Sequence, residues 1–167
     1  MAERGGSESS GPGRRAQDEV GSFDFGQTLA IADALPMGIA YVGPDRRYRF
    51  VNKALAEFFE RARSEMLGRT MEEVLGDEAM RVRGPMLDAA LSGERKFFAA
   101  DFAHPTRGPL TVQSDYLPQL APDGSVAGVV ILVNDVTEQR AAERALKESE
   151  ARFRRIADSA PVMMWVT

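Results

Sequence analysis

The chain is predicted to fold as an α+β domain with a five-stranded antiparallel sheet and short helices on one face. Three observations support this prediction. Two strand-like segments come first, several short helical segments follow, and three more strand-like segments precede a highly charged helix. Because strands and helices do not alternate strictly, a doubly wound parallel sheet is disfavoured. The 167 residues, 44% of them apolar, are enough for about one domain.

The folded domain is expected to begin at Phe23 and to end at residue 134. Residues 1–22 contain ten Gly, Ser or Pro and seven charged residues, too little apolar surface to offset the entropy lost on ordering. We therefore expect a disordered tail. Residues 25–35 carry apolar side chains at helical spacing up to Pro36, and this N-terminal cap helix is available to cover the second face of the sheet.

The first two strands are predicted to form a hairpin. Residues 38–42 are apolar, and Gly43-Pro44-Asp45 is a turn sequence. Residues 47–52 then alternate, with Tyr48 and Phe50 on one face of the strand.

Residues 53–91 change to helical spacing and are expected to form several short helices in series. Gly68 and Gly93 each follow a helical segment and are typical of helix ends. The apolar groups that mark the segments are Ala54, Leu55, Phe58 and Phe59, then Met66 and Leu67, then Met71, Val74 and Leu75, and finally residues 79–91.

Three strands are predicted after these helices, at residues 96–103, 110–117 and 126–134. The loop between the last two contains Pro122-Asp123-Gly124, a strong turn signal. Residues 129–133 are apolar at every position, so we expect this last strand to be covered on both faces.

A helical linker is predicted at residues 135–157. Asp135 stands three residues before Glu138, the spacing of a capping box, so a helix should start where the last strand stops. Half of residues 135–158 are charged, six of each sign. A heptad seam of Ala142, Leu146, Ser149, Phe153 and Ile156 favours a coiled coil, and a solvated single helix joining two domains fits the same spacing.

A short repeat relates the two ends of the chain. Residues 31–36, IADALP, return 125 positions later as residues 156–161, IADSAP, and an apolar segment follows each copy. We therefore expect residues 158–167 to be the truncated start of a second copy of the domain, within a longer protein.

Four segments together resemble the PAS domain, a sensory module of bacterial signalling proteins such as sensor histidine kinases. The segments are LPMGI at 35–39, RYRFVNKA at 47–54, SEMLGR at 64–69 and NDVTEQR at 134–140. The resemblance covers about residues 25–140. It implies the strand order 2-1-5-4-3, a pocket between sheet and helices, and a C-terminal signalling helix. It also makes Asp135 and Thr137 the junction that relays a signal from the last strand to that helix.

Apolar and aromatic side chains on strands and helices are the candidate lining of a ligand pocket, and they would equally form an ordinary packed core. The candidates are Tyr48, Phe50, Asn52, Phe58, Met66, Met86, Phe98 and Tyr116. For Asn52 a structural role as a helix cap is favoured over a ligand contact by about two to one.

The histidine and the arginines are weaker candidates for a ligand site than these apolar and aromatic residues. His104, the only histidine, precedes Pro105 in a turn-rich stretch, so a surface loop position is favoured. A solvated surface position is the default for six arginines, any of which could bind an anionic ligand. They are Arg47, Arg49, Arg81, Arg83, Arg95 and Arg107.

Composition excludes several classes of function. The chain has no cysteine, which rules out disulfides, thiolate catalysis and a cysteinyl flavin adduct, and the cytoplasm is the default location. A haem is not expected, because residues 79–91 contain no histidine. The net charge of −4 disfavours nucleic acid as a partner. No catalytic constellation or metal-ligand spacing is visible, so any catalytic domain would lie outside this chain.

Two functions remain open from the sequence. One is a signal-input module that relays binding of a small molecule or partner into its C-terminal helix and on to downstream domains of the same polypeptide. The other is a ligand-free dimerisation or spacer module. Both would act as a homodimer, and the identity of any cofactor is unknown.

Overall fold

The computed structural model describes residues 25–159, and the expectations for residues 1–22 and for most of 158–167 lie outside this range. Five strands form one antiparallel sheet in the order β2-β1-β5-β4-β3, as the resemblance implied. They are β1 (Gly38–Val42), β2 (Tyr48–Val51), β3 (Lys96–His104), β4 (Gly108–Leu120) and β5 (Val126–Asp135).

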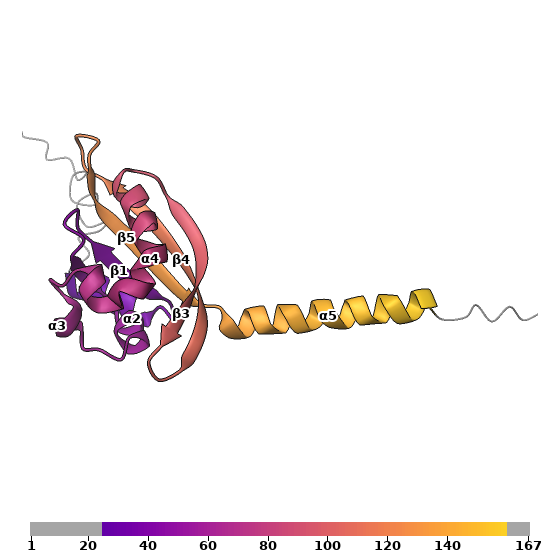
Figure 1. Ribbon diagram of the computed structural model, residues 1–167. Helices are drawn as coiled ribbons and strands as arrows, with labels where there is room; N and C mark the ends of the chain where they lie inside the picture. The colour runs from indigo at the N-terminus through magenta and orange to yellow at the C-terminus, as the bar shows by residue number, and fades with distance from the viewer. Residues whose placement is uncertain (1–24, 160–167) are drawn as a thin grey trace, which may run out of the picture.

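Four helices precede or interrupt the strands, and a fifth follows them. They are α1 (Phe25–Ala34), α2 (Lys53–Phe58), α3 (Arg63–Met66), α4 (Met71–Leu91) and α5 (Thr137–Ser159). Helix α2 packs on β1, and α4 crosses β3, β4 and β5 on the same face of the sheet, so the core lies between these helices and the sheet (Figure 1).

Helix α4 is two helical segments joined at Gly76. This residue has φ 79° and ψ 164°, a backbone conformation that is essentially restricted to glycine. Thr70 caps the first segment, since its hydroxyl accepts a hydrogen bond from the Glu73 amide and the Glu73 carboxylate accepts one from the Thr70 amide. The kink lets residues 71–75 and 77–91 approach the core at different angles.

Helix α1 does not cover the second face of the sheet, contrary to expectation. It packs mainly on α2, and none of its residues is buried. Asp33 accounts for this position, because its carboxylate accepts a hydrogen bond from the Lys53 amide and pairs with Arg63 at 2.5 Å. These bonds hold α1 beside the start of α2.

The outer face of β5 is likewise open within residues 25–159, so the expectation of cover on both faces is wrong for this part of the chain. Val130 and Leu132 point away from the helices and are half-buried, whereas Val129 and Ile131 face them and are buried. An uncovered apolar stripe therefore runs along the middle of the sheet.

Helix α5 leaves the sheet at the end of β5 and projects away from the domain (Figure 1). Beyond a few contacts with β4 it packs on nothing in the described chain, and none of its residues is buried. No helix of residues 25–159 is long and apolar enough to cross a membrane.

Candidate functional site

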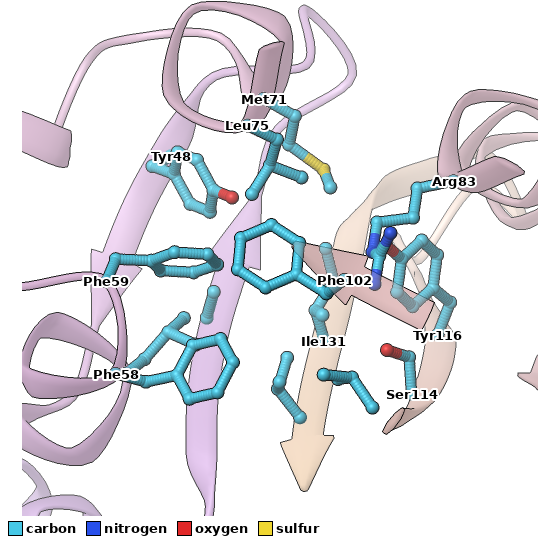
Figure 2. Close-up of a pocket in the computed structure, with 14 residues that line it drawn as sticks. Tyr48, Phe58, Phe59, Met71, Leu75, Arg83, Phe102, Ser114, Tyr116 and Ile131 are labelled. Carbon is cyan, nitrogen blue, oxygen red and sulfur yellow. The ribbon is translucent and has the colours of Figure 1, made fainter. Parts of the chain in front are cut away.

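A small cavity lies between the helices and the sheet. Its volume is about 20 Å³, which is room for about one water molecule. Aromatic rings and aliphatic side chains form most of its wall, together with four residues that carry polar groups (Figure 2). The lining residues are Ala40, Tyr48, Leu55, Phe58, Phe59, Met71, Leu75, Arg83, Phe102, Val112, Ser114, Tyr116, Ile131 and Val133.

Arg83 is the charged residue of the wall, and it is only 5% exposed. No carboxylate of the described chain pairs with it, and no hydrogen bond within residues 25–159 engages its side chain. Its guanidinium lies over the Phe102 ring, 5.4 Å from the ring centroid. Burial lowers the pKa of Arg83, since removal from water disfavours the charged form. The default of a solvated surface position is therefore wrong for this arginine.

Three hydroxyl groups share the wall with Arg83. Burial raises the pKa of Tyr48 and of Tyr116 well above the ordinary value, so both stay protonated and able to donate a hydrogen bond. Figure 2 shows the hydroxyls of Tyr48 and Ser114 directed toward the space between the rings. Within the described residues, no side-chain hydrogen bond engages any of the three. The wall thus offers one cation and three neutral donors.

Three of the eight side chains expected at a ligand pocket line this cavity: Tyr48, Phe58 and Tyr116. Met66 is buried in the core but not in the cavity wall, and Phe98 packs edge-on against Tyr116, with 5.2 Å between ring centroids. Met86 is half-buried against the core, and Phe50 lies on a half-exposed position of β2. The structure therefore brings together a subset of the expected residues.

Asn52 does not line the cavity and has a structural role instead. It is fully buried, and its Oδ1 accepts hydrogen bonds from the amides of Ile39 (2.8 Å) and Leu55 (3.1 Å). Its Nδ2 donates to the carbonyls of Ala32 (2.8 Å) and Met37 (3.0 Å). Because all four bonds are made within the protein, no capacity is left for a ligand.

His104 is a buried residue at the end of β3, so the expectation of a surface loop position is wrong. Its Nδ1 accepts hydrogen bonds from the amides of Thr106 and Arg107, at 3.3 and 3.1 Å. The ring must then carry its proton on Nε2, which donates to the Phe58 carbonyl at 2.6 Å. His104 thus ties the β3–β4 loop to the end of α2.

The same loop carries Arg107, which connects the cavity wall to the start of α5. The Arg107 guanidinium lies 5.9 Å from the centroid of the Phe58 ring, and its Nη2 donates to the Asp135 carboxylate at 2.6 Å. The other Asp135 oxygen accepts from the Thr137 amide (3.1 Å) and the Thr137 hydroxyl (2.6 Å). The Thr137 hydroxyl in turn accepts from the amide of Thr111 on β4, at 2.9 Å.

Asp135 and Thr137 therefore form a junction between β4, β5 and α5. The expected capping box is incomplete, since no hydrogen bond from the Asp135 amide to the Glu138 carboxylate is present in the described chain. Helix α5 begins at Thr137, and the Asp135 carboxylate, which lies just before the helix, accepts a hydrogen bond from the Thr137 amide. Partial burial acts to raise the pKa of Asp135, but the bonds from Thr137 and Arg107 outweigh it and hold the pKa below the ordinary value.

Replacing Asp135 by asparagine keeps an oxygen acceptor but removes the negative charge that pairs with Arg107 and faces the helix start, so it should lower the free energy of unfolding by about 0.5–1 kcal/mol near neutral pH. A carboxylate whose pKa is lower in the folded than in the unfolded protein stabilises the folded state. This stabilisation is complete above the unfolded-state pKa of about 3.9 and is lost as the pH falls through the folded-state pKa. The difference between wild type and variant should therefore shrink below about pH 4. Urea unfolding over a pH series measures it.

Glu138→Gln is the matched control for this experiment. Its carboxylate is exposed and takes no part in the junction, so its effect should stay within about 0.5 kcal/mol. Equal losses in the two variants would mean that the charge near the helix start matters and the specific bonds of Asp135 do not.

Comparison with known proteins identifies the fold. Residues 32–141 match the family described as the PAS fold. The chain belongs to this family. Its PAS domain is a signal-sensing, non-catalytic fold.

Solved PAS structures have the same architecture. The chain is similar to the PAS domain of BvgS from Bordetella pertussis, with a TM-score of 0.58 and 22% identity over 75% of this chain and 95% of that one. A PAS domain from Colwellia psychrerythraea gives a TM-score of 0.57 and 12% identity, over 68% and 97% of the two chains. A sensory box sensor histidine kinase from Vibrio cholerae gives 0.53 and 21%, over 66% and 89%. At such identities the likeness concerns the fold.

One curated relative shares a more closely related segment. The uncharacterized protein y4lL of Sinorhizobium fredii is 57% identical over 47 residues, which make up 28% of this chain and 6% of that protein. The matched segment is thus a small part of the relative's length.

Arg83 is the charged residue of the PAS cavity, and among the six candidate arginines nothing in its residue type distinguished it from a surface residue. A signal for it was present, because Met80, Arg83, Leu87 and Ala90 follow 3, 4, 3 spacing and so share one face of α4. All four are buried. The position of an arginine on an otherwise apolar helix face indicates a function more strongly than the presence of an arginine does.

Proposed function

We propose that this PAS domain is the signal-input module of a multidomain bacterial signalling protein, a sensor histidine kinase, and that a small molecule in the cavity changes how α5 is held. The observation that carries the proposal is the connection from Phe58 in the cavity wall through Arg107 to Asp135. The similarity to the sensor histidine kinase of Vibrio cholerae supports the choice of output.

The connection offers a simple mechanism. A ligand that displaces the Phe58 ring also displaces the surface against which Arg107 packs. Since Arg107 pairs with the carboxylate that binds the first amide of α5, the position of the helix start depends on that ring. The signal is thus a shift in the equilibrium between two positions of the helix start, and its size is set by the difference in ligand affinity between them.

Native mass spectrometry combined with hydrogen exchange tests this function. Protein purified from cells should carry a bound small molecule, and removing that molecule should change the exchange rates of the amides at residues 137–141. In Arg107→Ala the molecule should still bind, but those amides should no longer respond. The proposal would be contradicted if the purified protein carries no bound molecule and the removal step leaves the hydrogen-exchange rates of α5 unchanged.

The alternative function, a ligand-free spacer, is favoured by one observation. The cavity of about 20 Å³ is much smaller than typical ligand sites, which hold several hundred Å³. A ligand therefore requires that side chains of the wall move. An empty protein in the mass-spectrometry experiment would support the spacer.

We further propose that the module is a homodimer. The uncovered outer face of β5 and the exposed apolar residues of α1, Phe25 and Ile31, offer the larger surface. On α5, Leu146 and Phe153 are 61% and 73% exposed and lie on one seam. Two heptads with Ala142 and Ser149 in the seam are marginal in water, so we expect the coil to contribute the smaller share.

Sedimentation velocity checks this arrangement. Wild type should sediment as a dimer. The double variant Leu146→Glu/Phe153→Glu should weaken the association of the two chains without abolishing it. Ala141→Glu/Ala151→Glu adds the same charge away from the seam and should leave the dimer unchanged. A monomeric wild type would contradict dimerisation, while complete dissociation in the seam variant alone would show that α5 is the main contact.

A further inference from the structure

We propose that the cavity takes a small monocarboxylate with an apolar, aromatic-sized body, and that Arg83 binds the carboxylate. This inference rests on the proposed sensory function and specifies the ligand of the same site. Its starting point is a cation that is 95% buried without a counter-charge in the described chain, since a buried charge is costly unless it is paired.

The polar groups of the wall border open space. Every fully enclosed polar side-chain atom of the described residues has a hydrogen-bond partner. The side chains of Arg83, Tyr48, Ser114 and Tyr116 make no such bond, so their unpaired atoms face the cavity or the surface beside it. A guanidinium with neighbouring hydroxyl donors is the donor set that a carboxylate prefers.

A groove on the surface gives access to this set. It lies between α4 and β3, has a volume of about 270 Å³, and shares Leu75, Arg83 and Phe102 with the inner cavity. These three side chains therefore form the partition between the two spaces. Rotation of the Phe102 ring would join them into one site of the size that small ligands occupy.

The rest of the lining defines the body of the ligand. Phe58, Phe59 and Phe102 form an aromatic cluster, with centroid distances of 5.1 to 5.8 Å between the rings. Such a wall favours an apolar ring over a polar chain.

The outer groove limits the charge of the ligand. Glu78 and Asp101 line it, and neither forms an ion pair with Arg83. A second negative group reaching outward would meet these carboxylates, and like charges repel at close range. One negative charge is therefore accommodated and two are not.

Isothermal titration with four probes tests the inference on the full chain: phenylacetate, its neutral isostere phenylacetamide, the dianion succinate, and inorganic phosphate. Wild type should bind phenylacetate roughly 10- to 100-fold more tightly than the amide, because hydrogen bonds to a charged group are the strong ones. Succinate and phosphate should bind more weakly than phenylacetate.

Three variants locate the effect. In Arg83→Gln the preference for the acid over the amide should fall to about onefold, and Arg83→Lys, which keeps the charge without the planar fork, should retain part of it. Arg81→Gln, on an exposed position of the same helix, should bind as wild type does. Thermal melts of all three confirm folding, and Arg83→Met serves in place of the glutamine variant if that one unfolds.

The outcomes separate this inference from the function it rests on. Equal binding of acid and amide, or an unchanged preference in Arg83→Gln, would overturn the carboxylate and leave the sensory function intact. Binding of none of the probes at millimolar concentration would also overturn it. If, in addition, the purified protein carries no small molecule, the sensory function fails with it.

Discussion

Asn52→Ala should lower the free energy of unfolding by about 2–4 kcal/mol, the largest loss expected from any substitution considered for this chain. The side chain makes four hydrogen bonds from a fully buried position, and alanine removes all four. The amides of Ile39 and Leu55 and the carbonyl of Met37 lose this partner, while the Ala32 carbonyl keeps the hydrogen bond from the Leu35 amide at 3.4 Å. Those groups belong to α1, the segment before β1, β1 itself and α2. The loss of one side chain therefore loosens the connection between four consecutive parts of the domain.

Chemical denaturation of Asn52→Ala beside Asn134→Ala measures the effect. Asn134 lies on an exposed position of β5, so its replacement should change the free energy of unfolding by no more than about 0.5 kcal/mol. A loss below about 1 kcal/mol at Asn52 would show that water enters and replaces the four bonds.

Arg83→Met is expected to act in the opposite direction and to stabilise the ligand-free protein by about 1–3 kcal/mol. The substitution keeps an unbranched, flexible stem, shorter than that of arginine, and removes a charge that is buried without a partner in the described chain. Replacing buried charges by apolar side chains is often neutral or stabilising, and here no counter-charge in the described chain offsets the cost. Stability would thus be gained at the expense of ligand binding.

Thermal and urea unfolding of ligand-free protein check this result, with Arg81→Met as the matched control on the solvent side of the same helix. The control should stay within about 0.5 kcal/mol of wild type. If Arg83→Met is clearly less stable than wild type, the stacking of the guanidinium on Phe102 stabilises the fold. Burial of Arg83 would then be explained without a ligand.

The sheet could be predicted from the sequence because its signals are local. The hairpin at residues 38–52 is marked by its turn, and β5 by a continuous apolar run, and each strand was placed within about three residues of its observed ends. The strand order came from the resemblance, because alternation within a strand does not specify its neighbours. The orientation of α1 was missed, since it depends on Asp33 meeting Lys53 and Arg63 in space.

The candidate site was predictable only in part, for a similar reason. Aromatic residues identified the core, yet the sequence could not say which of them face a cavity, and five of the eight candidates do not. His104 was misplaced because the stretch that follows it is rich in turn residues, whereas its burial depends on the Phe58 carbonyl 46 residues away. Long-range contacts of this kind leave no local pattern.

The projection of α5 turns a small change at the junction into a large one at a distance. From Thr137 to Ser159 the helix has 23 residues, which at about 1.5 Å per residue gives a rod of about 34 Å. A tilt of about 10° at its base would sweep the far end through about 6 Å, more than one helical turn of about 5.4 Å. In the proposed signalling function α5 acts as a lever arm: a displacement of the order of one bond length around Asp135 is enough to move its far end by several ångströms.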